Sequence, residues 1–221
     1  MKTIIVPSVE PSDIIVYSNS YGDRNRQLAD ACMGLGCRPF HLVEMSGLEW
    51  DSDLSPWPAG KIITKSDDFR GNAGVYLQRL LSVVIPEAER SIGLNNPVRI
   101  LSGYSMAGLF ALYAMYSTDA FRGMASVSGS VWYPGFEDYA IKNGIKGNPA
   151  IYMSIGDMES RTRSPYLSGT EGVCRRLAEH FVSLGYDCCF ELNPGNHFTD
   201  MELRIAKAIC WLIGKRPGLC G

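Results

Sequence analysis

The sequence predicts an α/β fold over residues 1–221, organised as one domain with a mostly parallel sheet and helices on both faces. Short apolar runs alternate with longer amphipathic runs along the chain, which is typical of strands connected by helices. The short runs are apolar at nearly every position, as expected for parallel strands buried between two layers of helices. No internal repeat, low-complexity tract or linker divides the chain, so a single domain is expected.

The expected elements follow this alternation in chain order. The helix at 106–116 (MAGLFALYAMY) is so apolar that it should be buried nearly all round. Pro86 should kink the helix at 74–93, because proline has no N–H to donate inside a helix. A loop with two tryptophans at 47–68 and an irregular segment at 130–148 interrupt the pattern. Strands are expected at 14–20, 39–45, 98–105, 123–129, 150–156 and 188–195, and the other helices at 26–36, about 170–184 and 201–214.

Composition argues against several classes of function. Apolar residues make up 46% of the chain and charged residues 20%, and the net charge of -2 gives no attraction to nucleic acid or to an anionic membrane. No apolar run reaches the length of a membrane-spanning helix, and the N-terminal run is too short for a signal peptide. The seven cysteines lack metal-ligand spacing. We therefore expect no metal, no cofactor and a cytoplasmic protein with mostly reduced thiols, although a secreted protein without its leader would give the same pattern.

The hexapeptide GYSMAG, residues 103–108, places a serine between an apolar strand and an apolar helix. A nucleophilic serine at a sharp strand-to-helix turn needs small residues two positions before and after it, because strand and helix approach closely there. Gly103 and Ala107 meet that requirement around Ser105, although the usual pattern has glycine where Ala107 stands. The alternative is a helix start made of small residues, with Ser105 as its N-cap.

A nucleophilic serine also needs a histidine as its base. His197 lies in NPGNHFTD, the loop between the last expected strand and the last helix, which is where the base of an α/β-hydrolase follows the serine. His41 precedes the serine inside an expected strand, and His180 falls on or beside the apolar face of a helix. Both are therefore expected to be structural.

The acid that orients the histidine should follow the strand before the last one. The expected strand at 150–156 runs directly into Asp157 and Glu159. Acids of this layout commonly stand three residues after the terminal glycine of the strand, which favours Glu159, with Asp157 as the alternative. Asp157 is then expected to bond the backbone of its own turn.

The oxyanion of the reaction intermediate needs two backbone N–H donors. One is expected from Met106, the residue after the nucleophile. The other is expected from the loop after the first predicted strand, at Tyr21 or Gly22, because glycine permits a close backbone approach.

The segments GYSMAGLFALYA, SIGDMES and GNHF together resemble the α/β-hydrolase esterases grouped with esterase D and the enterochelin-esterase-like enzymes. SVSGSVWYPGF, after the strand beyond the serine, is similar to a further segment of that family. The resemblance covers roughly the last 125 residues well and the first hundred more loosely. It implies an α/β-hydrolase fold without a large cap domain, and hydrolysis of carboxylic esters. Its substrates range from short acyl esters and feruloyl or acetyl groups on sugars to siderophore trilactones, and some relatives rely mainly on a Ser-His pair.

Aromatic residues near the expected strand ends are candidates for the substrate pocket. Trp132 and Tyr133 follow the SGS segment, and Trp50 and Trp57 lie in the polar loop, where packing on the core is the equal alternative. Arg161 and Arg163 could meet an anionic substrate. The segment at 130–148 is the one candidate for a lid.

The prediction is a cofactor-free serine esterase that acts through an acyl-enzyme on a small-molecule or carbohydrate-linked ester. Transfer of the acyl group to an alcohol, or ligand binding without catalysis on the same fold, are the alternatives. The sequence does not predict the oligomeric state.

Overall fold

The computed structural model describes residues 1–22, 26–60 and 68–214. They form a seven-stranded sheet in the order β1-β3-β2-β6-β7-β8-β9. Strand β1 is antiparallel to β3, and the remaining neighbours are parallel. The sheet strands are β1 (Lys2–Val6), β2 (Ile14–Asn19), β3 (His41–Ser46), β6 (Val98–Tyr104), β7 (Gly123–Val127), β8 (Ala150–Gly156) and β9 (Cys188–Asn193).

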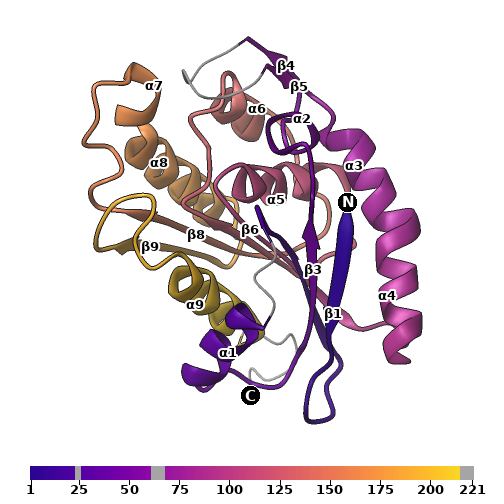
Figure 1. The fold of residues 1–221 in the computed structure, drawn as a ribbon. Coiled ribbons are helices and arrows are strands. Elements are labelled where there is room, and N and C mark those ends of the chain that lie inside the picture. The colour runs from indigo at the N-terminus through magenta and orange to yellow at the C-terminus, as the bar shows by residue number, and fades with distance from the viewer. Residues whose placement is uncertain (23–25, 61–67, 215–221) are drawn as a thin grey trace.

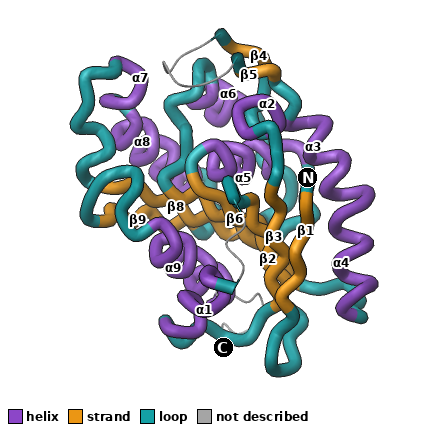
Figure 2. The backbone as a smooth tube through the Cα atoms, in the orientation of Figure 1, coloured by secondary structure: helices purple, strands orange, loops and turns teal. Residues whose placement is uncertain are grey.

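Helices cover both faces of this sheet, and a small hairpin stands apart from it (Figures 1 and 2). Strands β4 (Pro58–Ala59) and β5 (Phe69–Arg70) make that hairpin. The helices are α1 (Gln27–Gly34), α2 (Trp50–Asp53), α3 (Ala73–Arg79), α4 (Ile85–Ile92), α5 (Met106–Ser117), α6 (Phe136–Lys142), α7 (Pro165–Ser168), α8 (Thr170–Ser183) and α9 (Met201–Gly214), with a π-helical segment, η1 (Leu80–Val84), between α3 and α4.

Two separate apolar cores lie on the two faces of the sheet. In β2, Ile15 and Tyr17 point into the core shared with α3, α5 and α8, while Ile14 and Val16 point into the core shared with α1 and α9. Successive side chains of a strand point to opposite faces, so both faces can be buried only if nearly every strand residue is apolar. The predicted mostly parallel, doubly covered sheet is confirmed.

Helix α5 has the burial that its composition predicts. Every residue except Tyr113 and Ser117 is buried. A helix without a polar face can persist only inside the core, and α5 packs directly on β6 and β7. This position fixes the N-terminal end of α5 above the end of β6.

The structure corrects three expectations about single elements. The helix expected at 74–93 is interrupted by η1 just before Pro86, because the missing N–H of Pro86 leaves the i−4 carbonyl without its helical donor. The N-terminal run, for which no strand was expected, forms the edge strand β1. The irregular segment at 130–148 contains α6, whose residue Phe136 is fully buried, so this segment packs into the core.

Across the described residues, no helix combines the length and the apolar character that crossing a membrane would require.

Candidate active site

Ser105 is the single residue between the end of β6 and the start of α5. Its backbone has φ 59° and ψ -122°, a conformation that side chains rarely adopt. A Cβ on Gly103 would lie 2.2 Å from the backbone oxygen of Ala107, so the strand and the helix leave room for glycine alone. Ser105 stands at the N-cap position of α5 but makes no side-chain capping bond to the helix, so capping does not account for a serine at this place. The sharp turn predicted around Ser105 is therefore present.

The loop after β7 packs closely against this turn. A Cβ on Gly108 would lie 3.0 Å from the Cα of Gly129, so α5 and the loop are in near contact. The N–H of Ser130 donates to the carbonyl oxygen of Ser105 at 3.0 Å. The two hydroxyl groups are also paired, with Ser130 Oγ 3.4 Å from Ser105 Oγ. Ser130 thus holds the nucleophile candidate from its backbone and its side chain.

His197 and Glu159 form a close pair between the loops that follow β9 and β8. The distance from His197 Nδ1 to Glu159 Oε2 is 2.7 Å. The second oxygen, Oε1, accepts the N–H of Gly156 at 2.7 Å and the hydroxyl of Ser128 at 2.7 Å. Because Oε1 already has these donors, the carboxylate presents Oε2 to the imidazole. The structure brings Glu159, the favoured acid, to His197.

The side chain of Glu159 is only 8% exposed. Burial by itself raises the pKa of this carboxyl group, but the hydrogen bonds from His197, Ser128 and Gly156 outweigh it and hold the pKa below its ordinary value. Glu159 is therefore a carboxylate at neutral pH, as an acid that orients a histidine must be.

Asp157 has a different contact from the one expected. Its Oδ1 accepts the N–H of Gly195 at 2.8 Å, and its own N–H donates to the carbonyl oxygen of Asn193. Gly195 belongs to the loop that carries His197, so Asp157 ties two loops together and does not bond the N–H groups of its own turn. The side chain of Asp157 is exposed, and Glu159 occupies the place beside the imidazole.

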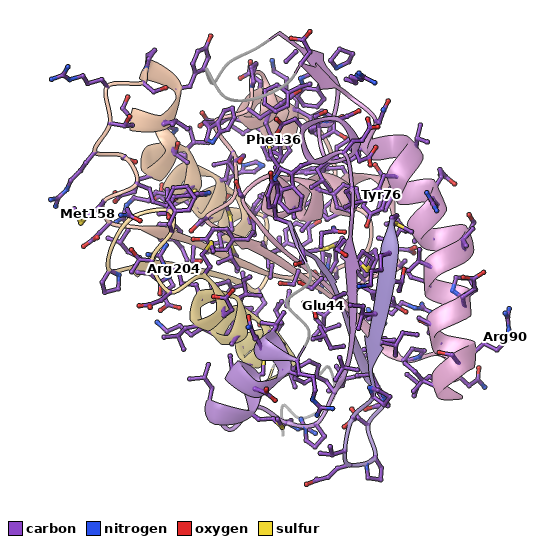
Figure 3. All side chains as sticks on the ribbon, viewed as in Figure 1. Glu44, Tyr76, Arg90, Phe136, Met158 and Arg204 are labelled. Atoms are coloured by element: carbon purple, nitrogen blue, oxygen red, sulfur yellow. The ribbon has the colours of Figure 1, made fainter. Side chains whose placement is uncertain are left out.

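A buried arginine completes the surroundings of Glu159. Arg204, on α9, is 1% exposed and donates to Glu159 Oε1 at 3.0 Å and to the carbonyl oxygen of Pro194 at 2.7 Å. It also lies 3.3 Å from the Tyr104 hydroxyl, which donates to the carbonyl oxygen of His197 at 2.8 Å. Figure 3 places Arg204 in the interior, whereas Met158, beside Glu159, points outward.

His197 lies beside the residue that precedes the nucleophile candidate. The rings of His197 and Tyr104 are 5.3 Å apart between centroids. Within the described chain, the hydroxyl of Ser105 is bonded to Ser130 and makes no hydrogen bond to the imidazole of His197. The base candidate thus lies against the residue that directly precedes the serine in sequence.

The two loops expected to hold an oxyanion start from adjacent strands in register. Asn19, the last residue of β2, pairs with Gly103 of β6. Tyr21 and Ser105 each stand two residues beyond that pair, so the first loop begins beside the nucleophile turn. Met106 is the first residue of α5, where helix geometry leaves the N–H without an intrahelical partner.

An open cleft of about 920 Å³ adjoins this loop. Tyr21 and Trp50 line it, and their rings meet edge to face with centroids 5.4 Å apart. Glu49, Asp51 and Asp68 add carboxylate groups to its wall, and part of the loop expected at 47–68 lies outside the described residues. Trp50 therefore stays a candidate for substrate contact.

Two of the other aromatic candidates hold the core together. Tyr133 is 1% exposed, and its hydroxyl donates to the carbonyl oxygen of Trp57 at 2.6 Å. The indole N–H of Trp57 donates to Pro134, and its ring packs on Phe136. The expectation that Tyr133 lines the pocket is wrong, because its side chain is inside the protein, and Trp57 packs on the core.

Trp132 is half-buried against Phe69 and Tyr133. Arg161 and Arg163 are exposed in the loop after Glu159. These three residues stay candidates for substrate contact.

The other two histidines have local partners. His41 is buried in β3, and its Nδ1 accepts the N–H of Ser8 at 3.2 Å. His180 lies on α8 with its ring beside Phe181. Within the described residues, His, Cys, Asp and Glu form no cluster of three or more that could hold a metal ion.

Comparison with known proteins identifies the fold. No family model matches the chain. Over 173 residues it is 27% identical to the uncharacterized protein YbbA of Bacillus subtilis (strain 168), an alignment that covers 74% of this chain and 69% of that protein. An IroE-like serine hydrolase from Shewanella oneidensis superimposes on 96% of this chain and 75% of its own, with a TM-score of 0.81 and 17% identity. The siderophore hydrolase EstA from Aspergillus nidulans superimposes on 92% and 83%, with a TM-score of 0.74 and 18% identity.

The chain has the α/β-hydrolase fold. Sequence reasoning singled out Ser105, His197 and Glu159 as candidates for serine, base and acid, but it missed the groups that contact them. Arg204 did leave a signal, because it repeats at four-residue spacing with Ala208 and Leu212 on the apolar face of the last helix. Tyr104, Ser128 and Ser130 left none, because their partners come from distant parts of the chain.

Proposed function

We propose that this protein is a serine hydrolase of carboxylic esters and that Ser105, His197 and Glu159 are its catalytic residues. The observation that carries this proposal is the strained turn at Ser105, next to a histidine held at 2.7 Å by a buried carboxylate. A strained serine is retained where its exposed hydroxyl is needed, and a neutral imidazole oriented by a carboxylate is the base that can activate it.

The reaction starts when Ser105 Oγ turns from Ser130 and attacks the carbonyl carbon of the ester. His197 Nε2 takes the hydroxyl proton, and Glu159 stabilises the imidazolium through Nδ1–H. The N–H groups of Met106 and of Tyr21 or Gly22 hold the negative oxygen of the tetrahedral intermediate.

The intermediate then collapses into an acyl-enzyme on Ser105. The C–O bond to the leaving alcohol breaks, and the alcohol takes its proton from His197. Water enters, His197 removes its proton, and the hydroxide attacks the acyl carbon. The acid is released as Ser105 regains its proton, so the enzyme returns to its starting state without a cofactor.

A siderophore-type ester is the substrate class to test first. EstA is named a siderophore hydrolase, and this chain shares its fold over most of its length. The cleft of about 920 Å³ beside Tyr21 and Trp50 can take a bulky ester. Short acyl esters and feruloyl or acetyl esters of sugars are the other members of the class.

Ser105→Ala tests the proposal directly. Wild type should hydrolyse p-nitrophenyl acetate and react with a fluorophosphonate probe, and the variant should lose both, with turnover falling by about 10³-fold or more. His197→Ala should behave in the same way. A variant that keeps near-normal hydrolysis, or a probe that still labels it, would show that Ser105 is not the nucleophile.

The same experiment separates the alternatives. A binding module would show no labelling in the folded wild-type protein. An acyltransferase would label, but an added alcohol would outcompete water for the acyl group, which product analysis detects.

A further inference from the structure

Arg204 is a charged side chain enclosed by the candidate active site. It is 1% exposed, and its guanidinium contacts groups from four separate segments. Burying a cation is unfavourable unless it is paired and fully hydrogen-bonded. The amphipathic helix α9 would pack against the sheet with an apolar residue at this place, so fold stability alone does not account for an arginine.

The first contact of Arg204 places a positive charge beside the acid. Nη1 lies 3.0 Å from Glu159 Oε1, the oxygen that faces away from His197. A carboxylate with a buried cation beside it stays ionised at lower pH than one without it. Arg204 therefore favours the ionised form of Glu159 without competing for the oxygen that His197 uses.

The other contacts of Arg204 set the position of the base. Nη2 donates to the carbonyl oxygen of Pro194 at 2.7 Å, three residues before His197. Nη1 lies 3.3 Å from the Tyr104 hydroxyl, which holds the carbonyl oxygen of His197. One planar guanidinium thus connects the acid, the loop of the base and the strand that ends at the nucleophile. A lysine ammonium is a single point and cannot reproduce this fork.

We propose that Arg204 is a positioning residue for the Glu159–His197 pair and that it sets the lowest pH at which the site works. The proposal rests on the function proposed above. The titratable and charged groups that face Glu159 are His197 from the loop after β9, Tyr104 from β6, Cys174 from α8 and Arg204 from α9. Of these, Arg204 alone carries a fixed positive charge at every pH of interest.

Two substitutions separate the two roles. Arg204→Met removes the charge and the fork. The Glu159–His197 pair should then take up its inactivating proton at a higher pH, because no buried cation opposes that proton, and the acid limb of the kcat/KM profile should move up by about one pH unit or more. Arg204→Lys keeps a charge and loses the fork. Its acid limb should stay in place while kcat falls by about 10- to 100-fold, because the loop of His197 is no longer held.

Lys207→Met is the matched control. Lys207 is a cation on the same helix, and its ammonium contacts Glu191 at 2.6 Å and Asn193 at 3.0 Å, not Glu159. The Lys207→Met variant should have an acid limb and a kcat close to those of wild type. An equal shift in Lys207→Met would overturn the proposal, since it would trace the effect to the net charge of α9.

Two measurements distinguish a positioning effect from a loss of folded protein. Fluorophosphonate titration counts the active sites that can still react, and thermal unfolding shows whether the variant is folded. If Arg204→Met does not fold, Arg204→Lys carries the test, and an unchanged kcat in that variant overturns the proposal. An unshifted acid limb in folded Arg204→Met overturns it as well.

A readout without catalysis keeps this inference distinct from the proposed function. The Nδ1–H proton of His197, bonded to Glu159, should give a low-field NMR signal that is absent in His197→Ala. That signal should weaken or disappear in folded Arg204→Met. If it persists unchanged, the inference fails, whereas a wild type without Ser105-dependent hydrolysis would refute the proposed function alone.

Discussion

Replacing Glu159 with glutamine should reduce turnover far more than replacing Asp157 with asparagine. Glutamine has nearly the shape of glutamate, but its amide has one acceptor and one donor end. The position of Oε1 is surrounded by donors from Gly156, Ser128 and Arg204, so the amide oxygen must lie there. The amide NH₂ group then faces His197.

This orientation forces the wrong tautomer on the base. His197 Nδ1, 2.7 Å from that position, must accept a hydrogen bond from the amide, which leaves the proton on Nε2. A protonated Nε2 cannot take the proton of Ser105. In a serine protease, changing the triad aspartate to asparagine has this effect on the histidine tautomer and lowers kcat by about 10⁴-fold. For Glu159→Gln we expect a loss of about 10³- to 10⁴-fold in kcat, which corresponds to about 4 to 5.5 kcal/mol in the activation barrier.

Asp157→Asn is the matched control, because it makes the same chemical change two residues away. Asparagine keeps an oxygen that accepts the N–H of Gly195, now 2.8 Å from Asp157 Oδ1, so the loss should stay below about tenfold. Steady-state hydrolysis of p-nitrophenyl acetate measures both variants, and circular dichroism with thermal unfolding checks that they fold. A loss in Asp157→Asn equal to or larger than that in Glu159→Gln would refute the assignment of the acid.

Three further outcomes are expected. Gly103→Ala should lower the free energy of unfolding, measured in urea, by about 3 kcal/mol or more, because its Cβ would lie 2.2 Å from the Ala107 oxygen. Gly34→Ala is the control: its Cβ would meet no atom within 4 Å, so the free energy of unfolding should not fall. The pKa of Glu159 is lowered on folding, so the stability that its carboxylate contributes is complete above about pH 4.3 and is lost as pH falls through the folded pKa. The difference in unfolding free energy between wild type and Glu159→Gln should therefore shrink below about pH 4.3. A difference that stays constant with pH would contradict this expectation. Ser105→Gly should be about 1–2 kcal/mol more stable than Ser105→Ala, because φ 59° strains alanine and suits glycine; the reverse order would mean that the turn is not strained.

The sequence predicted the sheet and its helices because these elements have strong local patterns. The runs that became β8 and α9 have the expected bounds, since a terminal glycine ends the strand and the apolar period of the helix is clear. The edge strand β1 was missed because its run of five residues gains its stability from pairing with β3. Helix α6 was missed because its burial comes from the aromatic cluster around Trp57, which the sequence order does not reveal.

The candidate site divides in the same way. Ser105, His197 and Glu159 were predicted because each follows a strand, and parallel strands end at one edge of a sheet. Ser130 and Arg204 were not assigned to the site, because their contacts join residues 25 and 45 positions apart in sequence. A serine next to a nucleophile is indistinguishable in sequence from any serine in a loop.

Backbone strain in this chain is concentrated around the candidate site. Among the described residues, four other than glycine have a positive φ: Asn96, Ser105, Ser128 and Asp200. Ser128 donates to Glu159, and Asp200 accepts the N–H of Arg204 at the start of α9. Each such conformation costs on the order of 1–3 kcal/mol, a sizeable part of a net stability of about 5–15 kcal/mol. Three of the four therefore lie where they aim the nucleophile, support the acid or begin the helix that carries Arg204. The packing of the two cores stabilises these turns, and this explains why residues that do not touch the substrate, such as Gly103 and Arg204, should still matter for the geometry of the site.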